Sequence, residues 1–162
     1  MMTKEQKITI YTDGAAKGNP GKAGWGAILF VGEKVIEIGG RTEHATNNQM
    51  ELTAPIEALK YLRNICVRQD LTQNIEIFSD SKYVILGITE WIFNWQKNNW
   101  RNAAKKPVLN RELWEELFEL TQGFSIKWNY VKGHNGDKYN DRVDLIATSF
   151  AEGCPVELKN AR

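Results

Sequence analysis

The fold class is indicated by one stretch of sequence, in which a strand is followed directly by a helix: Ile75-Glu76-Ile77-Phe78-Ser79-Asp80-Ser81. Its first five residues are mainly apolar and rich in strand-forming side chains, with Ile75, Ile77 and Phe78, which predicts a β-strand that ends at Asp80. Asp80 or Ser81 then caps a helix, because apolar side chains recur at helical spacing up to Trp95. Strands that are joined through helices pair in parallel, so this stretch indicates an α/β sheet.

The elements on either side of this stretch extend the same pattern. Residues 14–24 are rich in glycine and are expected to form a turn between the first two strands. Strands are expected at residues 8–12, 25–31, 34–38, 75–79 and 124–131, and helices at residues 48–63, 81–95, 111–121 and 139–151. The order β-β-β-α-β-α-α-β-α predicts a mixed five-stranded sheet that opens with an antiparallel meander and carries helices on both faces.

Composition limits the class of protein. The 162 residues are 42% hydrophobic and 25% charged, which fits one soluble globular domain and excludes disorder and collagen. No apolar run approaches the roughly 20 residues that a membrane span needs. Cys66 and Cys154 are too few for a disulfide framework, and residues 1–7 are polar, with no secretory signal visible. We therefore expect a cytoplasmic protein, and a monomer.

The charge is unevenly distributed along the chain. The net charge is +1, but the segment from Trp91 to Arg111 carries five basic residues and no acid. The basic residues of this segment are Lys97, Arg101, Lys105, Lys106 and Arg111. A basic segment on an otherwise acidic body suggests a localised contact with an anionic partner, although a solvated loop with incidental lysines would show the same composition.

Four carboxylates are candidates for a metal site. Asp13 and Asp80 each follow a strand, so they would lie side by side if the two strands are neighbours. Two like charges at that distance need a shared cation or proton, and Glu51 and Asp144 can join them. An all-oxygen set suits Mg²⁺ or Mn²⁺. Each acid also has a simpler explanation, as a helix cap, a turn residue, a partner of the helix dipole or a solvated side chain.

Five blocks of sequence, in this order, resemble type 1 ribonuclease H of the bacterial kind. The resemblance extends from about residue 8 to residue 151, which is nearly the whole chain. The blocks are Tyr11-Thr12-Asp13-Gly14 with Gly18-Asn19-Pro20-Gly21, Thr46-Asn47-Asn48-Gln49-Met50-Glu51-Leu52, Ser79-Asp80-Ser81, Trp128 through Val131-Lys132-Gly133-His134, and Asn140-Asp141-Arg142-Val143-Asp144.

The resemblance implies a fold, a reaction and a metal site. It implies the ribonuclease H fold and an endonuclease that cuts the RNA strand of RNA–DNA hybrids, leaving 5′-phosphate and 3′-hydroxyl ends. It implies two Mg²⁺ ions, which Mn²⁺ can replace, bound with the substrate by Asp13, Glu51, Asp80 and Asp144. Two metal ions can activate water and hold the departing oxygen, so no protein nucleophile is needed. The matching loop histidine, His134, is expected to assist proton handling or product departure.

The resemblance also implies how the hybrid is held. A basic protrusion at about residues 94–111 would grip the DNA strand, Thr46 and Asn110 would take a DNA phosphate, and Asn140 would lie beside the metal site. Amides that reach the minor groove, where 2′-hydroxyls distinguish RNA from DNA, would be Asn19, Asn47 and Asn48. Residues of the protrusion and its base that would contact the substrate are Trp91, Trp95, Lys97, Trp100, Arg101, Lys105 and Lys106. Trp91 also continues an apolar helix stripe and is therefore partly a core candidate.

The chain departs from the well-known bacterial form at three positions. Lys82 replaces a Gln and makes one groove contact ionic, Gln49 replaces an Arg, and His44 stands at or near an Arg of the phosphate pocket. None of these changes touches the four acids, so we expect activity to persist. Residues 1–152 are expected to form the catalytic domain, followed by a short tail at residues 153–162. Two alternatives stay open: another nuclease or strand-transfer enzyme on the same fold, and a non-catalytic hybrid-binding module.

Overall fold

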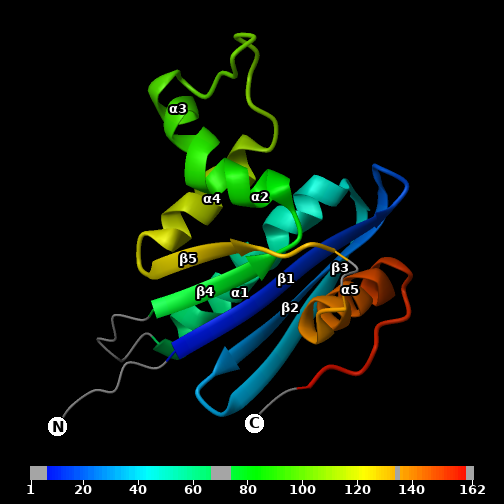
Figure 1. Ribbon diagram of the computed structural model, residues 1–162. Helices are drawn as coiled ribbons and strands as arrows, with labels where there is room; N and C mark the ends of the chain where they lie inside the picture. Colours follow the sequence, from blue (N-terminus) through cyan, green and yellow to red (C-terminus); the bar gives the residue numbers. More distant parts are fainter. Residues whose placement is uncertain (1–6, 67–73, 134–135, 160–162) are drawn as a thin grey trace, which may run out of the picture.

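A five-stranded mixed sheet forms the centre of the molecule (Figure 1). The computed structural model describes residues 7–66, 74–133 and 136–159. The strands are β1 (Lys7–Lys17), β2 (Gly21–Val31), β3 (Lys34–Ala45), β4 (Asn74–Ser79) and β5 (Ser125–Tyr130), and their order in the sheet is β3-β2-β1-β4-β5. β1, β2 and β3 pair antiparallel, whereas β4 lies parallel to both β1 and β5. The predicted mixed sheet is confirmed.

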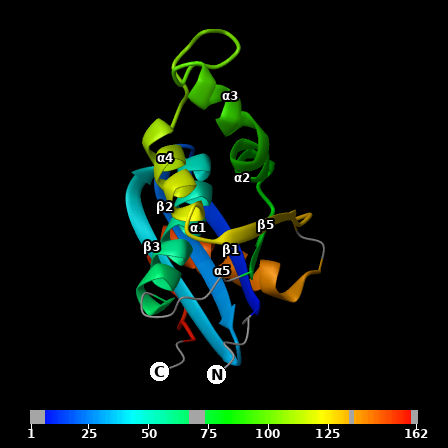
Figure 2. The same cartoon turned by 90° about the vertical axis from the view of Figure 1, so that its left-hand side faces the viewer.

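Helices cover both faces of the sheet, as predicted. The helical elements are α1 (Asn47–Cys66), α2 (Lys82–Leu86), the π-helical η1 (Gly87–Trp91), α3 (Ile92–Lys97), α4 (Arg111–Thr121) and α5 (Lys138–Ala151). α1 and α4 pack on one face, and α5 lies on the other (Figures 1 and 2). Within the described residues, no helix has the length and apolar character that crossing a membrane requires.

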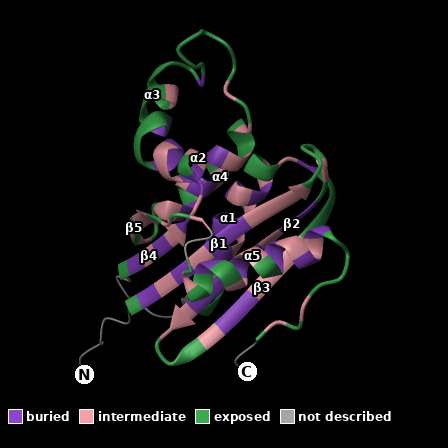
Figure 3. Ribbon diagram, turned by 45° about the vertical axis from the view of Figure 1, so that its right-hand side comes forward, coloured by how far each residue is buried: buried purple, intermediate pink, exposed green. Residues whose placement is uncertain are grey.

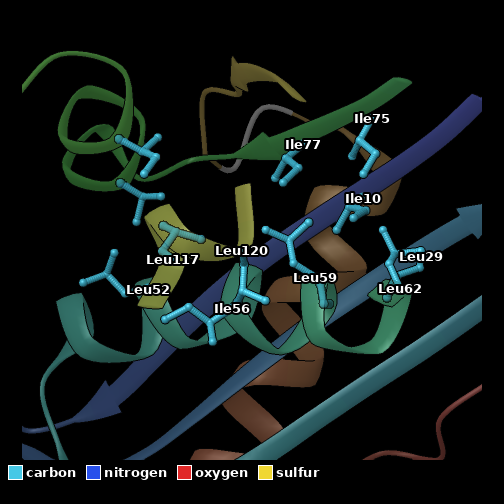
Figure 4. Packing of buried hydrophobic residues seen from close by; sticks show 14 of the residues in the cluster. Ile10, Leu29, Leu52, Ile56, Leu59, Leu62, Ile75, Ile77, Leu117 and Leu120 are labelled. Atoms are coloured by element: carbon cyan, nitrogen blue, oxygen red, sulfur yellow. The ribbon is translucent and has the colours of Figure 1, made fainter. Parts of the chain in front are cut away.

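The main core lies between the sheet and α1. Alternate residues of the central strands, such as Ile10 and Ile77, point toward α1, which presents Leu52, Ile56 and Leu59 at helical spacing (Figure 4). These residues are fully or almost fully buried, so the predicted buried helix is confirmed. Burying one such side chain contributes about 1.5–3 kcal/mol. This core fixes where α1 begins relative to β1.

Glycines set the position of α5 on the opposite face. A Cβ atom added at Gly24 would lie 2.4 Å from the carbonyl oxygen of Ala147, and one added at Gly26 would lie 2.7 Å from the side chain of Ile146. The backbone of β2 and the helix are therefore in direct contact at these two residues. Because α5 carries Asp144, these glycines help to place that carboxylate.

The opening strands are longer than the sequence predicts. The turn expected in the glycine-rich residues 14–24 spans only residues 18–20, since β1 continues to Lys17, β2 begins at Gly21 and Ala16 pairs with Ala23. β3 likewise continues to Ala45. Glycine and alanine are poor strand formers by propensity, but here their small size lets α1 and α5 approach the sheet closely, and packing outweighs propensity.

The helical run after β4 differs in one respect from the expectation. Ser81 caps α2 by accepting a hydrogen bond from the backbone N–H of Val84, as the sequence allows. The run then contains the π-helical turn η1 before it continues as α3. Gly87, at the start of η1, faces Trp114, and a Cβ atom there would lie 2.0 Å from the indole ring. The π-turn therefore coincides with the closest contact between this run and α4.

Residues 154–159 fold back onto the domain. The backbone N–H of Glu37 in β3 donates to the carbonyl of Lys159 at 2.7 Å, and the Lys159 N–H donates to the Glu37 carboxylate at 2.8 Å. Arg142 of α5 donates to both carboxylate oxygens of Glu37 at 2.8 Å. Burial raises the pKa of Glu37, but Arg142 and Lys159 outweigh it and hold that pKa below its ordinary value. The segment up to Lys159 is thus bound to both α5 and β3.

Candidate active site

The sheet places Asp13 and Asp80 side by side. The parallel pairing of β1 with β4 ends at Thr12 and Ser79, so these two acids are the next residues on neighbouring strands. The sequence suggests that Asp13 follows the end of its strand, but the structure places it within β1, opposite Gly26. Asp80 follows β4 directly and precedes Ser81, the cap of α2. Both acids therefore lie at the carboxyl end of the parallel β1–β4 pairing, as expected, although β1 itself continues beyond Asp13 in its pairing with β2.

Glu51 reaches the same place through a close contact between α1 and β1. A Cβ atom added at Gly14 would lie 2.4 Å from the carbonyl carbon of Met50 and 2.5 Å from the backbone nitrogen of Glu51. Only a residue without a side chain permits this approach. Glu51 lies beyond the first turn of α1, which contains no acidic residue, so a role as partner of the helix dipole does not account for it.

Three of the four acids predicted as metal ligands converge. Each of Asp13, Glu51 and Asp80 offers a carboxylate oxygen, and these oxygens lie within 4.8 Å of one another. Asp144 approaches the group from α5, close enough to contribute to the raised pKa of Asp13. Asp144 also lines a hollow of about 490 Å³ on α5, together with Asp141, Leu145 and Thr148. Asp13, Glu51 and Asp80 thus meet at one point, and Asp144 approaches Asp13 from α5.

Two acids of the cluster, Asp13 and Glu51, have raised pKa values when no cation is bound. Burial, followed by the charges of Glu51 and Asp80, raises the pKa of Asp13 to about 11. Burial and the charge of Asp80 raise the pKa of Glu51 to about 8, although hydrogen bonds from Asp13 and from the Gly14 backbone lower it in part. Neighbouring carboxylates repel one another in a poorly solvated site, so the folded protein takes up protons there.

The donor set fits a hard divalent cation. Glu51 Oε2 is buried and has no hydrogen-bond partner; only one other side-chain atom in the described residues, Thr12 Oγ1, shares this condition. A buried carboxylate oxygen without a partner is costly unless a cation meets it. Oxygen-only ligands at this spacing suit Mg²⁺, Mn²⁺ or Ca²⁺ and not zinc. Asp13, Glu51 and Asp80 can therefore hold a divalent metal ion.

The raised pKa values predict how the stability of the metal-free protein depends on pH. A carboxyl whose pKa is higher in the folded than in the unfolded state binds more protons when folded, so the free energy of unfolding falls as pH rises. In EDTA we expect the free energy of unfolding to fall between about pH 5 and about pH 8 by about 1.4 kcal/mol per pH unit for each proton that the folded site holds. Urea denaturation at both pH values tests this. Added Mg²⁺ should remove most of the loss, and a slope unaffected by Mg²⁺ would contradict the prediction.

The loop that follows β5 passes the acids at Gly133. A Cβ atom added there would lie 3.0 Å from Asp80 Oδ2. His134, the predicted loop histidine, lies outside the described residues, so its role stays a prediction. Asn140 is buried on α5, and its backbone N–H donates to Asp137, the cap of that helix. Its burial leaves little of the side chain for direct contact with a substrate.

Residues predicted to hold a DNA phosphate and to reach the minor groove gather at the start of α1. Asn19 Oδ1 accepts a hydrogen bond from the Asn47 backbone N–H at 3.0 Å, and Asn47 and Asn48 are both exposed. Gln49 lies between Thr46 and Asn110 and hydrogen-bonds with both. The sequence alone did not lead us to Gln49 as a link, although Thr46-x-x-Gln49 before an apolar run is the pattern of a capping box.

The segment between α3 and α4 projects away from the sheet (Figure 1) and is almost entirely exposed (Figure 3). The exposed basic residues on it are Lys97, Arg101, Lys105 and Lys106. At its base Trp91 is 37% exposed and Trp95 is half-buried, with ring centroids 6.0 Å apart. Lys82 is exposed and lies over the ring of Tyr130.

The structure corrects the role expected of Trp100. Its side chain is only 9% exposed and belongs to the main core, beside Trp95 and beneath the guanidinium of Arg111. A buried ring cannot lie against a sugar or base. Trp100 anchors the protrusion to the domain instead, which sequence pattern could not show because the segment around it is polar.

Comparisons with known proteins agree with this architecture. The family model described as RNase H matches residues 5–152. The chain is 48% identical over 151 residues to a ribonuclease H of Thermosynechococcus vestitus, covering 93% of this chain and 92% of that protein.

Two solved structures share the fold. LC9-RNase H1, described as a type 1 RNase H with the type 2 active-site motif, superposes with a TM-score of 0.82 at 21% identity, covering 99% of this chain and 80% of that one. LC11-RNase H1 in complex with an RNA/DNA hybrid gives a TM-score of 0.69 at 22% identity, covering 90% and 97%. A sheet of order β3-β2-β1-β4-β5 that gathers acids from β1, α1, the end of β4 and α5, together with a family match over most of the chain, shows that this protein belongs to the ribonuclease H family.

Proposed function

We propose that the protein is an endonuclease that hydrolyses the RNA strand of RNA–DNA hybrids and leaves 5′-phosphate and 3′-hydroxyl ends. The observation that carries this proposal is the cluster of Asp13, Glu51 and Asp80, whose carboxylate oxygens lie within 4.8 Å, in a chain of the ribonuclease H family. A phosphodiester is anionic and resists attack, so a site built only of acids must work through bound cations. The protein would therefore be a metal-dependent enzyme that hydrolyses phosphodiester bonds.

The chain's own residues hold and orient what the reaction needs. Asp13, Glu51, Asp80 and Asp144 would bind the metal through carboxylate oxygens, and we propose two Mg²⁺ ions when substrate is present, with Mn²⁺ as a substitute. Such ions, when bound, activate water and stabilise the departing 3′-oxygen. Gly14 keeps Glu51 against β1, and the packing of α5 on Gly24 and Gly26 keeps Asp144 beside Asp13. His134 is proposed to assist proton handling or product departure.

The hybrid would lie between the acid cluster and the protrusion. Exposed lysines and arginines of the protrusion suit the phosphates of the DNA strand, and the exposed part of Trp91 offers an aromatic face to a sugar or base. Asn19, Asn47 and Asn48 offer uncharged amides at the start of α1, which suits contacts in a wide, shallow minor groove. Lys82 would add an ionic contact, and Thr46 with Asn110 would take a DNA phosphate.

The test compares three nucleic acids. Labelled hybrid, duplex DNA and duplex RNA are incubated with the protein in Mg²⁺ or in EDTA, and the product ends are identified. We expect cleavage of the RNA strand of the hybrid alone, in Mg²⁺ only. Cleavage of duplex DNA would favour another nuclease or strand-transfer enzyme of this fold. Binding of the hybrid in Mg²⁺ without any cleavage would favour a binding module.

Replacing Lys105 and Lys106 together by Ala should weaken hybrid binding. The logarithm of the association constant falls linearly with the logarithm of salt concentration, and each phosphate contact contributes about one to the steepness of that line. We therefore expect the double variant to have a slope that is smaller in magnitude by about 1–2. Fluorescence anisotropy over a range of salt concentrations measures it. Lys34 and Lys127, both exposed and outside the protrusion, provide the control double variant. An unchanged slope in the Lys105/Lys106 variant would contradict the proposed role of the protrusion.

Further properties of the protein are proposals of the same kind. We propose a catalytic unit at residues 1–152 with a basic protrusion at about residues 94–111 and a tail at residues 153–162. We also propose a monomer and a cytoplasmic location. An exposed free thiol at Cys154 is consistent with a reducing compartment.

A further inference from the structure

A chain of hydrogen bonds joins the start of α1 to α2 through the start of α4. The Thr46 backbone N–H donates to Gln49 Oε1 at 2.9 Å, and Gln49 Nε2 donates to Asn110 Oδ1 at 3.3 Å. Asn110 Nδ2 donates to the Tyr83 hydroxyl at 3.2 Å. The indole N–H of Trp114 donates to the same hydroxyl at 3.1 Å. Both members of the proposed phosphate pocket, Thr46 and Asn110, therefore belong to one network.

The donors and acceptors in this hydrogen-bond network are fixed by the bond between Thr46 and Gln49. A backbone N–H can only donate, so the Gln49 oxygen must face Thr46 and its nitrogen must face Asn110. If the Asn110 amide were reversed, its NH₂ group would meet the NH₂ group of Gln49. The Tyr83 hydroxyl does not exclude the reversed amide, because it can donate to an oxygen as readily as it accepts from a nitrogen. Gln49 is thus the residue that decides which way the Asn110 amide points.

In this orientation both Asn110 and Thr46 keep a hydrogen-bond donor that no other residue uses in the bonds described. Asn110 uses one N–H for Tyr83 and keeps a second, and it makes no side-chain cap for α4 although it lies at that helix's N-cap position with φ 62°. Thr46 Oγ1 accepts the Gln49 backbone N–H at 3.1 Å, which leaves its hydroxyl proton to donate elsewhere. A phosphate oxygen can only accept, so it is bound by N–H and O–H groups and repelled by a carbonyl.

We propose that Gln49 is a positioning residue for the DNA strand. It holds the Asn110 amide with its N–H toward the pocket, so that Thr46 and Asn110 both donate to one DNA phosphate. The inference rests on the proposed function, because it concerns the substrate named there. The well-known bacterial form has an Arg at this position, whose charge could attract a phosphate directly. Gln49 is neutral and would act indirectly, by orienting the side chain of Asn110.

The test couples a protein change to a substrate change. Single linkages in the DNA strand of a hybrid are made uncharged as methylphosphonates, and Kd is measured in EDTA, with KM and kcat measured in Mg²⁺. In the unmodified protein, we expect one linkage whose neutralisation raises Kd and KM about tenfold and leaves kcat unchanged. In Gln49→Met, Kd for the ordinary hybrid should rise about tenfold, and neutralising that linkage should add little more.

Two further variants keep the test decisive. Gln49→Glu can still accept from the Thr46 N–H but offers no N–H to Asn110 and adds a negative charge, so neutralising the same linkage should lower Kd instead of raising it. Gln122→Met, at an exposed Gln beyond α4, is the control and should behave as the unmodified protein. Thermal unfolding confirms that each variant is folded.

The outcomes separate this inference from the proposed function. If Gln49→Met and Gln49→Glu respond to the neutral linkage as the unmodified protein does, Gln49 does not position Asn110 and the inference is overturned. The same conclusion follows if no linkage in the DNA strand is sensitive. A protein that binds hybrid with the expected coupling but never cuts it would instead overturn the proposed function alone, because Kd is measured without turnover.

Discussion

Replacing Asp13 by Asn should reduce hybrid cleavage on the order of 1,000-fold or more and, at the same time, stabilise the metal-free protein. The amide keeps the shape of the side chain but, unlike the carboxyl of Asp13, cannot become anionic and hold a metal ion with Glu51 and Asp80. Because Asp13 must take up a proton when the metal-free protein folds near pH 7 and an amide need not, we expect the free energy of unfolding in EDTA to rise by up to about 4 kcal/mol. Single-turnover cleavage in Mg²⁺ and urea denaturation in EDTA measure the two effects.

The opposite signs of these two effects make the prediction specific. A substitution that merely damages the fold would lower both activity and stability. Glu33→Gln, at an exposed acid in the turn between β2 and β3, removes one negative charge outside the cluster and should change neither quantity. Retained cleavage in Asp13→Asn would show that this carboxylate does not serve the reaction, and an unchanged or lower stability would show that the acids do not repel one another as described.

Gly14→Ala is the substitution with the second largest expected effect. The added methyl group would lie 2.4 Å from the Met50 carbonyl carbon and 2.5 Å from the Glu51 nitrogen, and backbone atoms cannot rotate away. The start of α1 must then move from β1 and carry Glu51 out of the cluster. Overpacking of this kind costs about 1–3 kcal/mol, and a displacement of about 1 Å at a reacting centre can cost about 100-fold in rate.

The measurements for Gly14→Ala are the free energy of unfolding and the dependence of cleavage on Mg²⁺ concentration. We expect lower stability and a requirement for more Mg²⁺. Gly123→Ala is the matched control, because a Cβ atom there would meet only the carbonyl oxygen of Leu120, at 3.9 Å. Normal Mg²⁺ dependence in a folded Gly14→Ala protein would mean that Glu51 is not held by the contact between α1 and β1.

Element order and the mixed sheet could be predicted because hydrophobic periodicity is local. The apolar run in residues 75–79 and the helical spacing in α1 and α4 are properties of single segments, and each segment formed as expected. The end of β1 could not be predicted in the same way. Residues 14–17 are strand because they pair with β2 and lie against α1, and neither partner is visible in the local sequence.

The candidate site shows the same limit. Neighbouring strands explain why Asp13 and Asp80 meet, and the resemblance to a family supplied Glu51 and Asp144, but the contact at Gly14 that brings Glu51 close is a property of the packed structure. Trp100 had the surroundings of a surface residue and proved to be buried. The network through Gln49 depends on residues far apart in sequence, so only its first bond, the capping box, had a local signal.

The bond between Glu37 and Lys159 has a practical consequence. β3 lies at one margin of the sheet, where unpaired backbone groups are a template for association with other chains. The backbone hydrogen bond from Glu37 occupies one of these groups, and Arg142 ties the same residue to α5. Shortened versions that end near Gly153 would uncover this margin and should aggregate more readily during purification.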